Sequence, residues 1–215
     1  MKSRGRGPAR PAAVRAWAIW SLPRWLAAFV AGVVLLDAAG LGFAASRPAG
    51  DRHDLILFAL LVACDVGALE LTRRAGEKAG ISRDMHAVWE LPVALLLPLV
   101  YAPVIPIIRL VLTQWRVRHG CLHRRVFSAC ALGLSYLAAA VVFRAVGTHL
   151  AGLGARPAAD PFRHGLAWLL VAAAACVVQR LVNAGLVFTA AKGADPAIRL
   201  RDAQFSREPM YNDVA

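Results

Sequence analysis

The chain has 215 residues, of which 59% are hydrophobic and 18% are charged, and its mean hydropathy is +0.54. Soluble domains are closer to half apolar and about a quarter charged. Here the apolar residues also come in long blocks without a helical or strand period, which indicates lipid as the solvent. The composition therefore predicts an all-α, polytopic transmembrane helix bundle.

The formal net charge of +12 is the second compositional feature. Such a charge is compatible with nucleic-acid binding, but the arginines flank apolar blocks and no nucleic-acid motif accompanies them. We therefore assign the charge to membrane topology and predict no nucleic-acid partner.

The chain begins with a basic segment, residues 1–24, which we expect to be a disordered cytoplasmic tail. The apolar block Trp25–Ala45 follows and ends near Gly42-Phe43-Ala44, a small-x-small pattern found at secretory cleavage sites. Because the block is longer than a usual signal core and contains Asp37, we interpret it as an uncleaved first span. Leu55–Leu71 predicts the second span.

The run from Val88 to Leu112 is apolar but is interrupted by four prolines. It is long for one span and short for two, since a span needs roughly 20 apolar residues. Each proline removes a backbone donor and clashes with the preceding helical turn. We predict a helical hairpin over residues 88–115, bent within Tyr101–Pro106, with Pro103 and Pro106 as the candidate hinge.

The predicted hairpin arms are Val88–Ala102 and Ile105–Trp115. Glu90 and Arg109 would lie toward the inner ends of these arms, where each could reach water or the other. Two further spans, Val126–His149 and Gly165–Ala190, complete the bundle.

Lysine and arginine counts predict the topology, because positive charges are retained on the cytoplasmic side. If the proline-broken run crosses once, 12 such charges lie inside and 10 outside; if it returns to the side of entry, 18 lie inside and 4 outside. We therefore predict four full spans plus the hairpin, about six helices over residues 25–190. Residues 191–215 form a short tail, and both termini are cytoplasmic at the plasma membrane.

Four charged residues inside the predicted spans are candidate intramembrane polar or ligand positions: Asp37, Asp65, Glu70 and Arg180. Glu70 and Arg180 fall at similar depths, about 21–22 Å from the outer face at helical rise, so we expect them to form a buried ion pair. Asp37 and Asp65 lie nearer the midplane and could form one polar layer. Either they serve a proton, ion or ligand site, or they form interhelical hydrogen bonds, and we favour the second reading.

Catalytic motifs are absent: the chain has no GxSxG, HExxH, GxxxxGK[ST] or GxGxxG before a helix. The four cysteines make no CxxC pair, so we predict no metal and no cofactor. His119, Cys121 and His123 lie close together in a basic loop, where metal or redox sensing competes with a simple solvated loop. We favour the loop, because the ligand set is incomplete.

One stretch, Ile81 to Phe143, carries a resemblance. It combines Ser82-Arg83-Asp84, the segment Trp89-Glu90-Leu91-Pro92 through Pro98, Tyr101-Ala102 and Arg124-Arg125-Val126-Phe127-Ser128. This stretch resembles the multi-pass N-terminal region of actinobacterial membrane signalling proteins, in which a cytoplasmic GGDEF diguanylate cyclase domain follows. This chain has no GGDEF sequence, so the resemblance transfers no catalytic residue.

The sequence-based expectation is thus a non-catalytic sensory or anchoring module of a signalling system. Its expected partners are the lipid bilayer and a second copy or a cytoplasmic signalling protein. The alternative is a small proton- or ion-coupled transporter that uses its intramembrane Asp, Glu and Arg residues.

Overall fold

The computed structural model describes residues 23–47, 50–74, 79–116, 122–150 and 161–194. All regular structure within these ranges is α-helical, which confirms the all-α part of the predicted fold class. The six helices are α2 (Arg24–Ala45), α3 (Arg52–Arg74), α4 (Ala79–Leu96), α5 (Tyr101–Arg116), α6 (Leu122–Leu150) and α7 (Pro161–Ala194). Most of the predicted basic tail, the tail after residue 194, and His119 and Cys121 lie outside the described residues.

Three of the described helices are long and apolar enough to cross a membrane: Arg24–Ala45 in α2, His123–Gly147 in α6 and Gly165–Ala194 in α7. The 22 residues of α2 span about 33 Å at helical rise, close to the ~30 Å of a bilayer core. These helices support a multi-pass membrane protein. Helix α3 carries three acidic residues and is not among the three.

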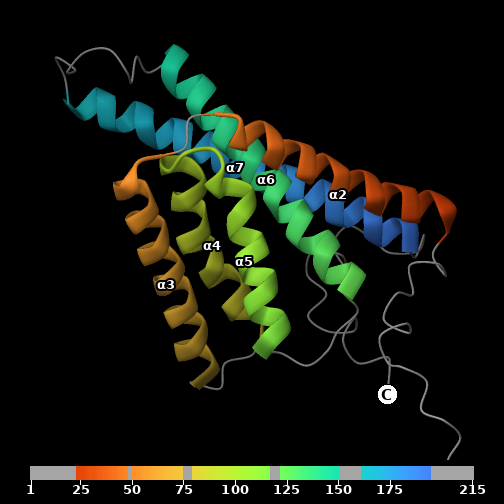
Figure 1. The fold of residues 1–215 in the computed structure, drawn as a ribbon. Helices are drawn as coiled ribbons and strands as arrows, with labels where there is room; N and C mark the ends of the chain where they lie inside the picture. Colours follow the sequence, from red (N-terminus) through yellow and green to blue (C-terminus); the bar gives the residue numbers. More distant parts are fainter. Residues whose placement is uncertain (1–22, 48–49, 75–78, 117–121, 151–160, 195–215) are drawn as a thin grey trace, which may run out of the picture.

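Helix α6 lies at the centre of the bundle and packs against α2, α4, α5 and α7. In Figure 1, α3, α4 and α5 stand side by side, whereas α2, α6 and α7 run obliquely to them. The buried face of α6 is rich in small residues, among them Ala131, Gly133, Ser135, Ala139 and Ala140. Small side chains let helix backbones approach closely, which is how helices associate in lipid.

Helices α4 and α5 form a hairpin, but its turn does not lie where the prolines predict. The turn is Leu97–Val100, and Tyr101–Pro106 is helical, so the predicted position of the bend is wrong. Pro98 disfavours a helical conformation at Leu97, and hydrogen bonds from the Tyr101 and Ala102 amides to the Pro98 and Leu99 carbonyls close the turn.

Pro103 and Pro106 lie inside α5, both fully buried. Pro103 is in the first turn, where a backbone N–H has no helical partner in any case, so its missing donor costs little there. Pro92 is likewise accommodated inside α4. The candidate hinge residues are therefore packed parts of a helix, with the turn N-terminal to them.

Two close contacts place the helix ends relative to one another. Gly50, just before α3, lies so close to the hairpin turn that an added Cβ would be 2.6 Å from the Pro98 Cγ. At the other end, a Cβ on Gly193 of α7 would collide with the indole of Trp25 at the start of α2. The hairpin turn thus lies beside the α2–α3 connection, and α2 begins beside the end of α7.

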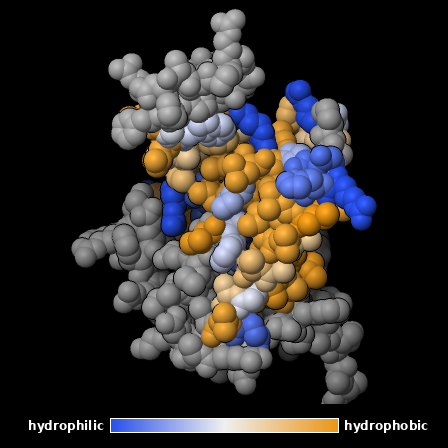
Figure 2. All heavy atoms as spheres, turned by 90° about the vertical axis from the view of Figure 1, so that its left-hand side faces the viewer, coloured by the Kyte–Doolittle hydropathy of each residue, from blue (hydrophilic) through white to orange (hydrophobic). Residues whose placement is uncertain are grey.

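Large hydrophobic side chains are exposed along the bundle. Leu35 on α2 and Leu169 on α7 are each about 70% exposed, and many others on α2, α3 and α7 exceed half. Figure 2 shows one such face, where hydrophobic side chains cover most of the described surface and hydrophilic ones gather toward its edges. Such a surface is typical of helices whose outer face meets lipid.

Candidate functional site

The most deeply buried charged group of the described bundle is Glu90 on α4, which is 0% exposed. The Arg109 guanidinium on α5 donates to both carboxylate oxygens through Nη1, at 3.3 Å each. The Tyr136 hydroxyl on α6 donates to Oε2 at 2.6 Å. One carboxylate therefore joins three helices.

Burial explains why this carboxylate needs both partners. An isolated charge in a low-dielectric interior is very costly, and it persists only when it is paired and hydrogen-bonded. Glu90 is fully buried, and its partner Tyr136 belongs to the apolar core that contains Val93, Leu97 and Ile105. The ion pair and the Tyr136 hydroxyl therefore compensate the desolvation of the carboxylate. The sequence-based expectation that Glu90 and Arg109 could reach each other is confirmed.

Asp65 of α3 adds a second carboxylate near this cluster. It is buried and lies close enough to Tyr136 to interact with it electrostatically. Glu90, Arg109, Tyr136 and Asp65, from α4, α5, α6 and α3, are called the polar cluster below. Sequence reasoning selected Asp65 but did not include Tyr136, because a single tyrosine in an apolar run is usually read as packing.

Asp37 lies elsewhere, between α2 and α6. It is buried, and its Oδ1 atom faces Gly133 closely enough that a Cβ there would be 2.5 Å from it. The Cys130 thiol, one turn earlier on α6, interacts with the Asp37 carboxylate, while Oδ1 has no hydrogen-bond partner in the structure. Asp37 and Asp65 thus have different neighbours, although the sequence suggested one shared layer.

Glu70 and Arg180, the pair expected from matched depth, are half-buried on α3 and exposed on α7, respectively. Their pairing stays a prediction. In the interior of the described bundle, Glu90 and Arg109 form an ion pair that joins the two arms of the hairpin.

Arg144 of α6 secures the hairpin turn, a role that the sequence did not indicate. Its guanidinium donates through Nη2 to the Leu97 carbonyl and through Nη1 to the Ala140 carbonyl, the latter at 3.3 Å. Carbonyls at a helix C-terminus lack helical partners, and a cation there satisfies them and complements the helix dipole. Arg144 therefore ties the end of α4 to α6.

The start of α3 brings Asp51, His53 and Asp54 together, with possible ligand atoms within 4.8 Å of one another. The Asp51 amide donates to Asp54 Oδ2 at 3.2 Å, and the Asp54 amide donates to Asp51 Oδ1 at 3.0 Å. This reciprocal pattern satisfies backbone donors at a helix N-terminus, as a capping box does. It accounts for both carboxylates as helix caps.

Comparison with protein-family models, with curated proteins and with solved structures finds no match.

Removing the Tyr136 hydroxyl is expected to weaken the polar cluster measurably. Tyr136→Phe keeps the ring but deletes the donor to Glu90, and we expect a loss of about 1–2 kcal/mol in the free energy of unfolding. SDS-induced unfolding in mixed micelles measures this. Tyr101→Phe is the matched control, because the Tyr101 ring contact with Phe58, at 4.6 Å between centroids, survives it. An equal loss in both variants would contradict a specific role for the Tyr136 hydroxyl.

Proposed function

We propose that this chain is a non-catalytic integral membrane module that senses a signal or anchors a signalling system. The observation that carries the proposal is that the buried polar side chains link one helix to another. In the described bundle, Glu90 is engaged by Arg109 and Tyr136, and Arg144 is bound to the Leu97 carbonyl. These groups join helices to one another, which suits a module that changes helix arrangement.

The proposed topology has four full spans, α2, α3, α6 and α7, together with the α4–α5 hairpin, and both termini in the cytoplasm. The arginine and lysine distribution favours it by 18 to 4. The position of Pro98 beside Gly50 supports it too, because the hairpin turn then lies at the same end as the α2–α3 connection. The actinobacterial signalling resemblance, which covers the hairpin sequence, enters this proposal as support for the sensory role.

The hairpin is the proposed moving part. Two of its polar links to α6 are Tyr136 to Glu90 and Arg144 to Leu97. A ligand, lipid state or partner that favours another arrangement of these links would shift the population of hairpin positions, by as much as its affinities for the two arrangements differ. The cytoplasmic ends of α5 and α7 would report that shift.

Thiol labelling tests the topology. Cys121 follows α5 in the chain and lies outside the described residues. With Cys64, Cys130 and Cys176 replaced by alanine, we expect a membrane-impermeant maleimide to label Cys121 in inside-out vesicles and not in intact cells. Ser46→Cys, at the exposed end of α2 next to the α2–α3 connection, is the matched control and should show the opposite pattern. Labelling of Cys121 from outside the cell would overturn the proposed topology.

Distance measurements test the sensory role. Spin labels at Val111→Cys and Ala194→Cys, both at exposed positions, report the separation of α5 and the end of α7 in full-length protein in bilayer nanodiscs, with the four native cysteines replaced by alanine. We expect Glu90→Gln to redistribute the distances, because it removes the charge that pairs with Arg109. Leu169→Ala, on the exposed face of α7, is the matched control and should leave them unchanged. A single distribution shared by the wild type and Glu90→Gln would count against the proposal.

A small proton- or ion-coupled transporter is the second candidate, and one observation favours it. The polar cluster places the carboxyl groups of Glu90 and Asp65 around one tyrosine inside the bundle. Ionisable residues at membrane depth often mark ion or proton paths. Proteoliposomes with an internal pH-sensitive dye separate the candidates. Proton flux that is lost in Asp65→Asn would support transport, and flux equal to that of protein-free liposomes would support the sensory module.

A further inference from the structure

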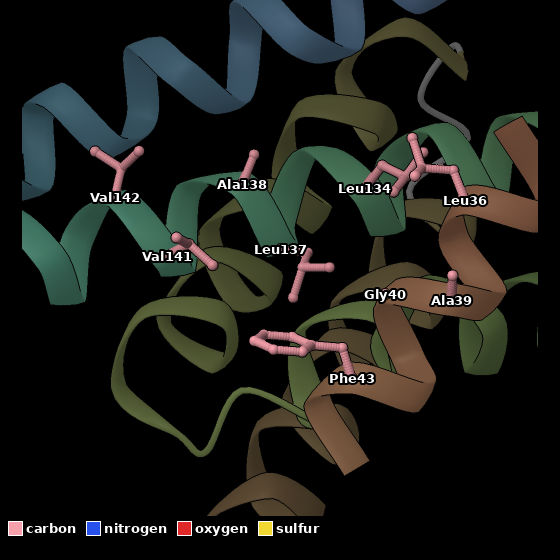
Figure 3. Close-up of a pocket in the computed structure, with 9 residues that line it drawn as sticks. All are labelled: Leu36, Ala39, Gly40, Phe43, Leu134, Leu137, Ala138, Val141 and Val142. Carbon is pink, nitrogen blue, oxygen red and sulfur yellow. The ribbon is translucent and has the colours of Figure 1, made fainter. Parts of the chain in front are cut away.

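A groove of about 510 Å³ lies between α2 and α6, and its lining is wholly apolar. Figure 3 shows the lining residues on the two helices, with the Phe43 side chain of α2 pointing toward Leu137 of α6 and Leu36 lying beside Leu134. It opens to the surface, since Leu36, Phe43 and Val141 on its walls are 61%, 49% and 45% exposed. Its volume lies in the range of sites that bind small molecules.

Small residues create the groove. Ala39 and Gly40 on α2 and Ala138 on α6 leave the space that larger side chains would fill. Leu137 forms the floor, because its Cδ2 atom would lie only 2.6 Å from a Cβ at Gly40. The result is an elongated apolar slot along two helices that the composition assigns to the membrane.

A cation lies at one end of this slot. The Arg47 side chain, just beyond the end of α2, lies over the Phe43 ring with its Cζ 4.8 Å from the ring centroid. Arg47 is exposed, and Phe43 is itself part of the groove wall. A guanidinium presents a rigid fork of donors that suits phosphate oxygens, and stacking on an aromatic ring holds it in place.

The apolar slot suits an acyl chain and the guanidinium suits a phosphate, and a phospholipid contains both. We propose that the α2–α6 groove binds a membrane phospholipid, with one acyl chain lying along Leu36, Leu137 and Val141 and the phosphate held by Arg47. The site requires only that α2 and α6 cross the membrane. It does not depend on a sensory role, and in the proposed topology the lipid belongs to the outer leaflet.

Lipid titration followed by native mass spectrometry tests the site. The full chain, stripped of lipid in detergent, is titrated with dioleoyl phosphatidylglycerol. We expect one lipid to bind the wild type and Arg47→Gln to weaken that binding by about tenfold, because it removes a charge-assisted phosphate contact. We expect Ala138→Leu, which fills the groove, to weaken it as much. Glycerophosphoglycerol, the headgroup without chains, should not bind.

Two controls distinguish a specific site from general lipid contact. Arg24→Gln removes an exposed arginine at the opposite end of α2, and Ala173→Leu adds the same side chain at an exposed position on α7. Both should bind lipid like the wild type. If Ala138→Leu fails to fold, Ala39→Leu at an exposed position of the same groove replaces it. Equal affinity in Arg47→Gln and the wild type, or an equal loss in the controls, would overturn the site. These lipid-binding results are independent of the distance measurements at α5 and α7, so the lipid site and the sensory role can fail separately.

Discussion

Replacing Arg109 by methionine is expected to lower the free energy of unfolding by about 3–5 kcal/mol. The substitution keeps a long apolar stem in α5 but removes the charge opposite Glu90, a carboxylate that is 0% exposed. The substitution leaves a buried carboxylate without its ionic partner, although the Tyr136 hydroxyl still donates to it, and an unpaired buried charge costs far more than the pair itself contributes. The midpoint of SDS-induced unfolding in mixed micelles, followed by far-UV circular dichroism, measures the loss.

The double variant Glu90→Gln/Arg109→Met separates a lost ion pair from lost packing. Glutamine keeps an oxygen that can accept the Tyr136 hydrogen bond, and no buried charge remains at this position. We expect the double variant to recover most of the stability, because replacing both members of a buried pair is often close to neutral. Arg124→Met, which alters an exposed arginine on α6, is the matched control and should change the stability by less than about 0.5 kcal/mol. A loss below 1 kcal/mol in Arg109→Met would show that Glu90 does not depend on this partner.

The helical blocks of this bundle could be predicted from sequence because each is a long apolar stretch bounded by arginine, glycine or proline. Trp25–Ala45 differs from the observed α2 by one residue. The hairpin was predictable for the same reason, since prolines must interrupt the long run. Its turn was misplaced because a proline is tolerated in the first turn of a helix, so Pro98, and not Pro103 or Pro106, ends α4.

The candidate site was less predictable, because depth along a helix gives only one of the two coordinates of a side chain. Glu70 and Arg180 match in depth, but whether two side chains meet also depends on the rotation of each helix about its axis, which the packing determines, so their pairing stays a prediction. Glu90 and Arg109 could be linked because a short hairpin places its arms side by side. The Tyr136 contact joins residues 46 positions apart and depends on where α6 packs against the hairpin. No local pattern carries that information.

Gly133→Ala is expected to destabilise the contact between α2 and α6 by about 1–3 kcal/mol. The new Cβ would lie 2.5 Å from Asp37 Oδ1 and 3.3 Å from its Cγ, and Asp37 is buried, so the carboxylate or the helix must move. The sign of the stability change is informative, because a glycine-to-alanine substitution in a helix otherwise raises the stability by about 0.5–1 kcal/mol. Gly185→Ala on α7 is the matched control: its Cβ would meet no atom within 4 Å, so this variant should be stabilised.

A second substitution shows whether Asp37 is the cause of that loss. Asp37→Ala removes both the atom that the new methyl group meets and a buried oxygen that has no hydrogen-bond partner. We therefore expect Asp37→Ala/Gly133→Ala to be more stable than Gly133→Ala alone, with a coupling energy of at least about 0.5 kcal/mol between the two positions. Unfolding midpoints of the wild type, both single variants and the double variant complete the cycle. Additive effects, or equal stabilisation by Gly133→Ala and Gly185→Ala, would mean that Asp37 does not pack against Gly133. The α2–α6 interface, and with it the floor of the lipid groove, would then need a different register.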